Sequence, residues 1–340
     1  MGEPEDTILE LAKKIRAEKN FDDVLGITWR KGKKILKNPD RPWIKNLDEL
    51  PFPAWHLINK NNYIMPFTDK PFFLVATGRG CPYQCLFCAD KAYYGQKLRL
   101  RSPKRIIDEL EYNQKRYGVS DFLFWTESFT INENFAWQVC EEIIARGLKV
   151  SWVCNSRVDN VDLKLLKKFK QAGCQMIGYG IESGSQEVLN RARKGTTLEQ
   201  TIRAVTLAKQ ADLEVTGHCI VGLPGETKET IRQTEKFVAS LGLDFAQFYC
   251  AVPFPGSDLY FLAKKKNWII SDDWSLYEQN FSVLSYKKLR ADQIMNLRQQ
   301  AYKNFYLSPR TIINTLLRLR SPKEIWKFIF MAKDFISWIK

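Results

Sequence analysis

Three cysteines in one short loop constrain this chain more than any other feature of its sequence. Cys81, Cys85 and Cys88 follow a C-x3-C-x2-C spacing, directly after the apolar run 71–76. That run is typical of a buried strand, so the thiols fall in the loop at its carboxyl end. A [4Fe–4S] cube ordinarily has four cysteine ligands. Three thiolates on one loop can bind three of its irons and leave the fourth open to a chelating ligand.

Zinc and a disulfide are two simpler interpretations of this loop. A structural zinc ion takes four ligands, and no further Cys or His near the loop completes such a set. Gly78 and Gly80 precede the first cysteine and allow the backbone to wrap closely around a cluster. The spacing therefore favours the iron–sulfur interpretation.

The composition limits the classes of protein to which this chain can belong. The chain has 340 residues, of which 45% are hydrophobic, enough for a substantial core. It shows no signal-peptide pattern and no apolar stretch near the ~20 residues that span a bilayer. Eight cysteines without secretory features indicate a reducing compartment. We therefore expect a cytoplasmic protein whose remaining cysteines pack in the core.

The chain carries a formal net charge of +14, which suits nucleic acid, an anionic membrane or an anionic substrate. No nucleic-acid recognition motif accompanies the charge, so we expect no nucleic-acid partner. Residues 323–340 have an apolar helical face flanked by lysines and tryptophans. Two interpretations stay open for this segment: a helix that covers the core, or a helix that gives peripheral contact with a membrane interface.

An alternation of strands and helices begins at residue 71. The strands are expected at 71–77, 121–126, 149–155, 174–181, 214–221 and 245–252. The helices are expected at 103–117, 132–146, 162–172, 185–211 with a break near Gly195, and 227–241. This alternation predicts an α/β fold with a parallel sheet, and leaves a doubly wound sheet and a partial barrel open.

The flanking segments follow other patterns. Residues 4–19 predict an amphipathic helix, and residues 24–36 predict a hairpin that turns at 30–32. Prolines interrupt residues 38–55, which excludes a long regular element there. Residues 257–266 predict a further helix, and residues 291–339 predict helices interrupted at Pro309 and Pro322.

Polar or glycine-rich residues follow five of the expected strands. In barrel enzymes the working residues lie at the carboxyl ends of the strands. The cysteine loop follows the first strand, and the later strands end at Glu127, at Asn155 and Arg157, at Glu182 and Ser183, and at Ile220 and Gly222. This recurrence is hard to obtain from packing alone, so we expect these residues to share one site.

The cysteine loop, with the aromatic Phe87 before its third cysteine, resembles the radical S-adenosylmethionine (SAM) superfamily. The segment Gly-Leu-Pro-Gly-Glu-Thr at 222–227 is similar to the subgroup that contains a cobalamin-binding domain. This resemblance implies a (β/α)6 partial barrel of TIM type. It also implies a [4Fe–4S] cluster on Cys81, Cys85 and Cys88, whose open iron binds SAM.

The resemblance also assigns the strand-end residues to SAM. Glu127 would accept from the ammonium of SAM, and Arg157 would pair with its carboxylate. Glu182 and Ser183 would bond the ribose or the amino-acid part, while Ile220 and the Gly222 backbone would line the adenine. The full set expected to contact SAM is Phe87, Glu127, Asn155, Arg157, Glu182, Ser183, Ile220 and Gly222.

The same resemblance implies that the chain is divided into three parts. Residues 1–66 are similar to the remnant and connector of a cobalamin-binding domain, on the strength of segments 2–8 and 50–55. Residues 67–270 would form the radical SAM core and residues 271–340 a helical C-terminal extension. The D-x-H-x-x-G cobalt-ligand motif is not found in the sequence. We therefore expect no tight cobalamin binding by the chain itself.

The implied activity is reductive cleavage of SAM to a 5′-deoxyadenosyl radical, which abstracts hydrogen from an unactivated carbon. C-methylation or a related modification of a small-molecule or lipid substrate is the leading expectation. A ring-forming oxidation like that of anaerobic porphyrin cyclases is the second, and a non-catalytic truncated partner subunit is an alternative of another class. The expected partners are a reductant such as flavodoxin or ferredoxin and, for methyl transfer, a separate corrinoid-binding protein.

Overall fold

A parallel sheet of six strands lies at the centre of the computed structural model, which describes residues 2–65, 69–316 and 326. The strand order is β10-β9-β8-β7-β6-β3. The strands are β3 (Phe72–Ala76), β6 (Asp121–Trp125), β7 (Ser151–Ser156), β8 (Cys174–Glu182), β9 (Glu214–Val221) and β10 (Phe245–Cys250). All six expected strands are confirmed, with bounds that differ by two residues or fewer.

The strand order decides between the two expected architectures. Neighbouring strands follow one another along the chain from β3 to β10, and every pair is parallel. A doubly wound sheet reverses its order at a switch point, and this sheet does not. The strands β3 and β10 remain as two edges, so the fold is a (β/α)6 partial barrel.

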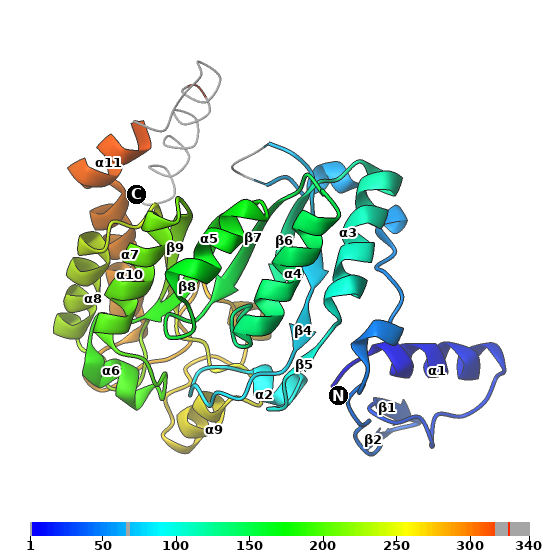
Figure 1. Cartoon of the computed structure of the whole chain (residues 1–340). Coiled ribbons are helices and arrows are strands. Elements are labelled where there is room, and N and C mark those ends of the chain that lie inside the picture. The colour runs from blue at the N-terminus through cyan, green and yellow to red at the C-terminus, as the bar shows by residue number, and fades with distance from the viewer. Residues whose placement is uncertain (1, 66–68, 317–325, 327–340) are drawn as a thin grey trace.

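Helices cover one face of this sheet (Figure 1). They are α3 (Pro103–Tyr117), α4 (Glu133–Ala145), α5 (Leu163–Gln171), α6 (Gln186–Arg191), α7 (Leu198–Gln210) and α8 (Lys228–Ser240). The run expected at 185–211 breaks into α6 and α7, as the sequence predicts near Gly195. Gly195 itself has a φ of +70°, in the left-handed region that glycine enters at little cost.

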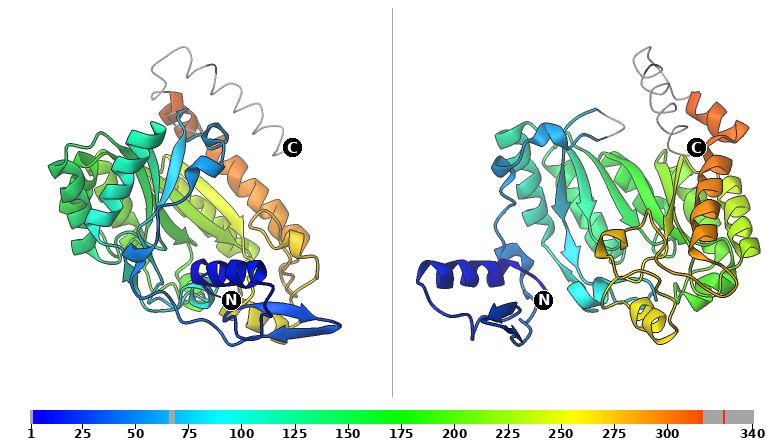
Figure 2. Two further views of the ribbon diagram at one scale, coloured as in Figure 1. Left: turned by 90° about the vertical axis from the view of Figure 1, so that its right-hand side faces the viewer. Right: turned by 180° about the vertical axis from the view of Figure 1, so that it is seen from behind.

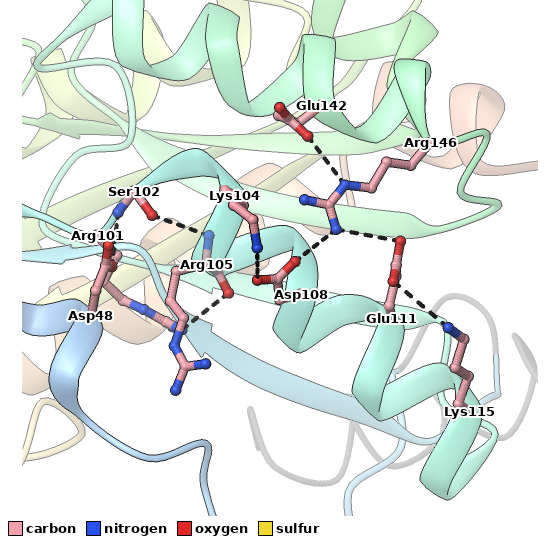
Figure 3. Close-up of polar contacts among 10 residues, drawn as sticks. All are labelled: Asp48, Arg101, Ser102, Lys104, Arg105, Asp108, Glu111, Lys115, Glu142 and Arg146. Carbon is pink, nitrogen blue, oxygen red and sulfur yellow. Dashed lines mark hydrogen bonds and ion pairs between the residues drawn. The ribbon is translucent and has the colours of Figure 1, made fainter.

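The ends of α3 show why helices begin and end where the sequence places them. The Ser102 hydroxyl accepts a hydrogen bond from the Arg105 amide at 3.1 Å, and Pro103 opens the helix. Gly118 ends it with a φ of +65°. Figure 3 shows this N-terminus together with Arg146, the residue directly after α4, which contacts Asp108 of α3 at 2.8 Å. Such surface ion pairs orient neighbouring helices but contribute at most about 1 kcal/mol each.

The core lies between the sheet and these helices. Successive side chains of a strand point to opposite faces, and Phe122, Phe124 and Trp152 point to the helices. The rings of Phe124 and Trp152 stack with centroids 4.7 Å apart. Each fully buried aromatic side chain stabilises the fold by about 2–3 kcal/mol through area removed from water. The alternate residues of each strand therefore lie on the opposite face, which we call the inner face.

The N-terminal part begins with α1 (Glu5–Arg16), followed by the hairpin β1 (Thr28–Lys31) and β2 (Lys34–Lys37). The predicted turn at 30–32 is wrong by about one residue. Lys31 still pairs with Lys34, and the turn lies at 32–33, where Gly32 has a φ of +60°. On α1 the apolar stripe is present, but Ile8 and Ile15 are 61% and 59% exposed. Leu11 of the stripe is half-buried, so the described residues cover only part of it.

Glu3 connects the N-terminal part, through hydrogen bonds, to the short strand that leads into the cysteine loop. Its carboxylate accepts hydrogen bonds from Arg79 at 3.0 Å, Arg99 at 2.9 Å and the Ile44 amide at 2.7 Å. Burial opposes the charge of Glu3, but the bonds from Arg99 and Arg79 outweigh it and lower its pKa. Short 3-10 turns at Leu47–Glu49, Trp55–Leu57 and Lys60–Asn62 follow, and no long helix or strand forms there, as the prolines predict.

The C-terminal part consists of α9 (Asp258–Lys265), a 3-10 turn at Trp274–Leu276, α10 (Ala291–Tyr306) and α11 (Pro309–Leu316). The expected interruption at Pro309 is confirmed. Helix α10 packs beside the edge strand β10 (Figure 2), where the buried Arg298 donates to the Phe248 carbonyl at 2.7 Å. Residues 323–340 lie outside the described residues except for Trp326, so both interpretations of that segment stay predictions. Within the described ranges no helix is long and apolar enough to cross a membrane.

Candidate active site

The cysteine loop lies between two short elements at the carboxyl end of β3. The small strand β4 (Gly78–Arg79) pairs with β5 (Arg99–Leu100), and α2 (Asp90–Tyr93) follows the third cysteine. Between them Gly80 has a φ of +86°, and a side chain there would overlap the Lys97 carbonyl. This close approach of two backbone segments explains the need for glycine at that position.

The three thiols line one small pocket. Cys81, Cys85 and Cys88 share it with Asp90 and Asp258, among other residues. The loop is held on two sides, because the Leu86 amide donates to the Ala192 carbonyl at 2.9 Å and the Leu86 carbonyl accepts from the Leu259 amide at 2.8 Å. The end of α6 and the start of α9 therefore fix the position of the cysteines.

The electrostatics of the loop fit ligands to iron better than a reactive thiol. Burial raises the pKa of Cys81 to about 11 and also raises the pKa of Cys85. A nucleophilic cysteine needs a lowered pKa, whereas a thiol that binds a metal loses its proton to solvent when the metal displaces it. In the described part of the chain, no three Cys, His, Asp or Glu side chains converge on one metal ion. Thiols that bind three different irons of a cube do not need to converge in that way.

Glu127 follows β6 and faces the start of α2. Its carboxylate lies against that of Asp90, and burial together with this hydrogen-bonded neighbour raises the pKa of Asp90 to about 8. One oxygen of Asp90 is buried without a hydrogen-bond partner in the described part of the protein. Two carboxyl groups beside the cysteines form an acceptor site that suits an ammonium group.

Arg157 follows β7, and its guanidinium carbon lies over the ring of Tyr83 in the cysteine loop, 3.6 Å from the ring centroid. Its Nε and Nη2 donate to the two carboxylate oxygens of Asp159 at 2.9 and 2.8 Å, and Nη2 also donates to the Lys194 carbonyl at 2.9 Å. The guanidinium thus reaches the cysteine loop as expected. It already has a carboxylate partner, Asp159, which the sequence reasoning missed.

Glu182 ends β8 and forms a buried ion pair with Lys194. The Lys194 Nζ lies 2.7 Å from the Glu182 Oε1, and both side chains are almost fully buried. Glu182 has a φ of +62°, a strained value for a residue other than glycine, and the strand register shifts there. A Cβ on Gly180 would lie 2.6 Å from Glu182 Oε1 and 2.7 Å from Lys194 Nζ, so a glycine at 180 makes room for the pair.

Lys194 is the main functional candidate that the sequence reasoning missed. It lies in the break between α6 and α7, where a lysine beside an arginine and a glycine suggests a solvated turn. Burial opposes its charge, but Glu182 and Cys85 outweigh that effect and raise the pKa of Lys194. Its position next to the expected break at Gly195 was the only available signal, and that signal does not predict burial.

Ser183 does not join this group. Its hydroxyl lies 3.1 Å from the Thr234 hydroxyl of α8 and accepts from the Ser185 amide at 3.2 Å. The side chain is fully buried against that helix. The hydroxyl of Ser183 thus already has partners inside the protein, and its expected contact with the ribose or the amino-acid part of SAM stays a prediction.

Ile220 and Gly222 lie at the end of β9. Ile220 packs with Leu86 of the cysteine loop in an apolar cluster that Phe87 also contacts. The Gly222 amide donates to the Glu226 carboxylate at 2.6 Å, and its carbonyl accepts from the Tyr286 hydroxyl at 2.7 Å. Both backbone groups of Gly222 are thus used inside the protein. The expectation that Ile220 and the Gly222 backbone line the adenine stays a prediction.

Asn155 lies on β7, two positions before Arg157. It is one position short of the end of β7, opposite Gly178 of β8, on the inner face of the sheet. The site near the cysteines therefore collects Glu127, Arg157, Glu182 and the missed Lys194, with Ile220 and Phe87 packed beneath the loop.

Sequence comparison agrees with this geometry. The profile of the radical SAM superfamily matches residues 75–238. An uncharacterised methyltransferase of Pyrococcus horikoshii is 35% identical over 315 residues, which are 93% of this chain and 68% of that protein. The anaerobic magnesium-protoporphyrin IX monomethyl ester cyclase of Cereibacter sphaeroides is 32% identical over 314 residues, 90% of this chain and 50% of the cyclase. The chain thus spans only about half of that cyclase.

Solved structures share the fold at low identity. The cobalamin-dependent SAM radical enzyme OxsB, with aqua-cobalamin and SAM bound, superposes with a TM-score of 0.71 at 17% identity, covering 98% of this chain and 54% of OxsB. The radical SAM methyltransferase TsrM of Kitasatospora setae gives a TM-score of 0.63 at 17% identity, covering 80% of this chain and 54% of TsrM. The chain belongs to the radical SAM superfamily, whose enzymes use a [4Fe–4S] cluster and SAM.

Proposed function

We propose that this chain cleaves SAM reductively and directs the resulting radical to an unactivated carbon of a small-molecule or lipid substrate, for C-methylation or a related modification. When bound, the cluster and SAM supply one-electron cleavage of a carbon–sulfur bond and a 5′-deoxyadenosyl radical. The observation that carries the proposal is the approach of three strand ends to one loop. Glu127, Arg157 and Glu182 each come from a different strand and lie beside Cys81 or Cys85.

The residues of this chain would hold the cofactors by complementary charge. Cys81, Cys85 and Cys88 would bind three irons. The carboxyl groups of Glu127 and Asp90 would accept from the ammonium of SAM, and the cations of Arg157 and Lys194 would face its carboxylate. Ile220 would lie against the adenine. Because these side chains are buried and already paired within the protein, they are held in one geometry before the cofactors bind.

Two relatives favour different outcomes for the substrate. The Pyrococcus relative carries the name methyltransferase, and the Cereibacter relative is a cyclase. Methylation is our leading proposal, because methyltransferases occur both among the sequence relatives and among the structural neighbours. A ring-forming oxidation is the second candidate, because the cyclase aligns with 90% of this chain.

Anaerobic reconstitution with iron, sulfide and a reductant tests the proposal. We expect 5′-deoxyadenosine from SAM, with tetrapyrrole, lipid and peptide candidates screened as substrates. Methylation would produce S-adenosylhomocysteine as a further product and raise the mass of the substrate by one CH2. Oxidation would remove hydrogen from the substrate and produce no S-adenosylhomocysteine. A reconstituted protein with a full cluster that yields no 5′-deoxyadenosine would contradict the proposal.

We also propose how the parts and partners divide the work. Residues 67–270 would be the catalytic core, 271–340 an extension that closes the β10 edge, and 1–66 a connector. A flavodoxin or ferredoxin would supply the electron. For methyl transfer, a corrinoid-binding domain from another polypeptide would dock on residues 1–66, where Ile8 and Ile15 expose an apolar stripe.

A further inference from the structure

A cavity of about 350 Å3 lies between residues 47–54 and the edge strand β3. A volume of this size is in the range that holds small molecules. The lining residues are Leu47, Leu50, Pro51, Phe52, Pro53, Ala54, Ala76 and Gly78, together with the charged side chains of Glu5, Arg79, Arg101 and Glu109. None of them lines the pocket of the three cysteines. The cavity is therefore a feature separate from the candidate active site.

Arg105 and Asp48 hold one wall of this cavity in place. Arg105 Nη2 donates to the Leu50 carbonyl at 3.0 Å, and its guanidinium carbon lies 3.9 Å from the centroid of the Phe52 ring. The Asp48 carboxylate accepts from the Ser102 amide at 2.9 Å, at the start of α3 (Figure 3). Two prolines restrict the backbone of the same wall. The wall is therefore formed before any ligand binds.

Glu109 of α3 presents a buried acceptor to the cavity. The residue is 1% exposed, and its Oε2 forms an ion pair with Arg101 Nη1 at 2.6 Å. Its Oε1 is buried and accepts no hydrogen bond from any described residue. Burial raises the pKa of Glu109, although Arg101 acts in the opposite direction. A buried acceptor without a partner is costly, so Oε1 needs a donor from a ligand or a water.

Glu5, at the start of α1, brings a second acceptor to the same cavity. Its Oε1 pairs with Arg79 Nη2. Its Oε2 is buried and has no hydrogen-bond partner in the described part of the chain. Glu5 and Glu109 thus each direct one oxygen to an arginine and leave the other without a donor. Two such oxygens favour a ligand that donates hydrogen bonds.

The balance of charge decides which donor suits the cavity. The four charged side chains that line it form two ion pairs, Arg101 with Glu109 and Arg79 with Glu5. A charged ligand would therefore lose its hydration without a counter-charge of its own, and an anion would also meet two carboxylates. A neutral group with two N–H donors, such as a primary carboxamide, supplies hydrogen bonds without added charge. The apolar lining residues suit a hydrocarbon or aromatic body.

We infer that this cavity is a second small-molecule site, which binds a neutral ligand with an apolar body and an N–H donor group of the carboxamide type. The N–H donors would bind the unpartnered carboxylate oxygens of Glu109 and Glu5. This inference goes beyond the proposed function, because it does not depend on SAM or on the cysteines.

Matched probes added to the full chain, before and after loading with iron and SAM, test the site. Benzamide and acetophenone differ in an NH2 group against a methyl group, and benzoate carries an anion in the same place. We expect benzamide to bind roughly threefold to tenfold more tightly than acetophenone in saturation-transfer NMR titrations, the contribution of one hydrogen bond. Benzoate should bind more weakly than benzamide. Loading should leave the affinity for benzamide unchanged, because the two pockets share no residue.

Variants locate the binding. Glu109→Met should abolish the preference for benzamide over acetophenone. That variant leaves Arg101 buried and unpaired, so a second variant, Ala54→Phe, fills the cavity from an exposed residue and should weaken binding of both probes. Leu57→Phe is the matched control, since Leu57 is 77% exposed and does not line the cavity.

Three results would overturn the inference. The first is equal affinity of the wild type for benzamide and acetophenone, or no measurable binding of either. The second is unchanged binding in Ala54→Phe. The third is loss of benzamide binding on loading with iron and SAM, which would place the probe in the cysteine pocket instead.

Discussion

The Lys194 ammonium lies 2.7 Å from the Glu182 carboxylate, and only 6% of each residue is exposed. The pair joins the end of β8 to the break between α6 and α7, directly beside Cys85. A buried pair costs desolvation of two charges, and removal of one partner leaves the other without compensation. The pair therefore links the stability of the fold to the electrostatics of the site.

Lys194→Met should lower the free energy of unfolding by about 3–5 kcal/mol, because it leaves the Glu182 carboxylate buried and unpaired. Urea unfolding measures this loss. The double variant Glu182→Gln/Lys194→Met should recover most of it. Arg193→Gln removes the neighbouring exposed ion pair with Asp258 and should cost no more than about 1 kcal/mol. Equal losses of unfolding free energy in Lys194→Met and Arg193→Gln would refute the contribution of the buried pair to stability.

Arg157→Ala should weaken SAM binding at least about tenfold, since loss of a desolvated charged partner costs about 2–5 kcal/mol. Equilibrium dialysis of the iron-loaded protein measures the affinity, and iron content shows whether the cluster is retained. Arg157→Lys keeps the charge but loses the two-pronged bond to Asp159 and the contact of the guanidinium with the Tyr83 ring, so we expect an intermediate affinity. Unchanged SAM affinity in Arg157→Ala would exclude a contact with SAM.

Glu226 should make the fold less stable as pH rises. Burial raises its pKa from 4.5 to about 8, although one oxygen accepts from the Gly222 and Leu223 amides at 2.6 and 3.0 Å. Between these two values the folded chain holds a proton that the unfolded chain has lost. The free energy of unfolding therefore falls with rising pH in this window, by up to about 1.4 kcal/mol per pH unit.

Glu226→Gln keeps the oxygen that accepts both amides and removes the ionisation. Urea unfolding across this pH window should show a flatter profile for Glu226→Gln than for the wild type. The exposed Glu229→Gln serves as the matched control and should leave the profile unchanged. Identical profiles for wild type and Glu226→Gln would show that Glu226 does not titrate in this window.

Cobalamin should not bind tightly to this chain alone. Its only histidines are His56 and His218, and neither lies in a D-x-H-x-x-G motif. His218 faces the inner side of the sheet with its Nδ1 near Tyr249, and His56 is exposed in the 3-10 turn Trp55–Leu57. Equilibrium binding of hydroxocobalamin to the anaerobically purified protein measures this. Stoichiometric binding with a protein histidine on cobalt would contradict the prediction, and His56→Ala would then identify the ligand.

Much of the fold could be predicted because its signals are local. The apolar runs and the caps at Ser102 and Gly118 place strands and helices to within a few residues. The consecutive strand order is not local, and the resemblance to the superfamily, rather than periodicity, favoured the barrel over a doubly wound sheet. The hairpin was shifted because the conformation of Gly32, and not the apolar pattern, sets the turn.

Only the site residues that follow the ends of strands could be predicted from the sequence. The cysteines and the positions of Glu127, Arg157 and Glu182 follow from that rule. Lys194 was missed because a lysine in a turn gives no signal of burial. The partners of Arg157 and Ser183, namely Asp159 and Thr234, depend on side-chain directions that the sequence does not contain. The contact of Asn155 with SAM stays a prediction, because a strand end alone does not tell which ligand a side chain meets.

The cluster assignment is the central claim, and SAM cleavage by Cys85→Ala tests it most directly. Cys85 lies between the other two cysteines in the loop, beside Lys194, Glu182 and Arg157. Wild type and variant would be reconstituted anaerobically, reduced and assayed for 5′-deoxyadenosine. We predict that the wild type forms it and that Cys85→Ala forms none, while the buried Cys250→Ala behaves as wild type. Formation of 5′-deoxyadenosine by Cys85→Ala at the wild-type rate would contradict the account.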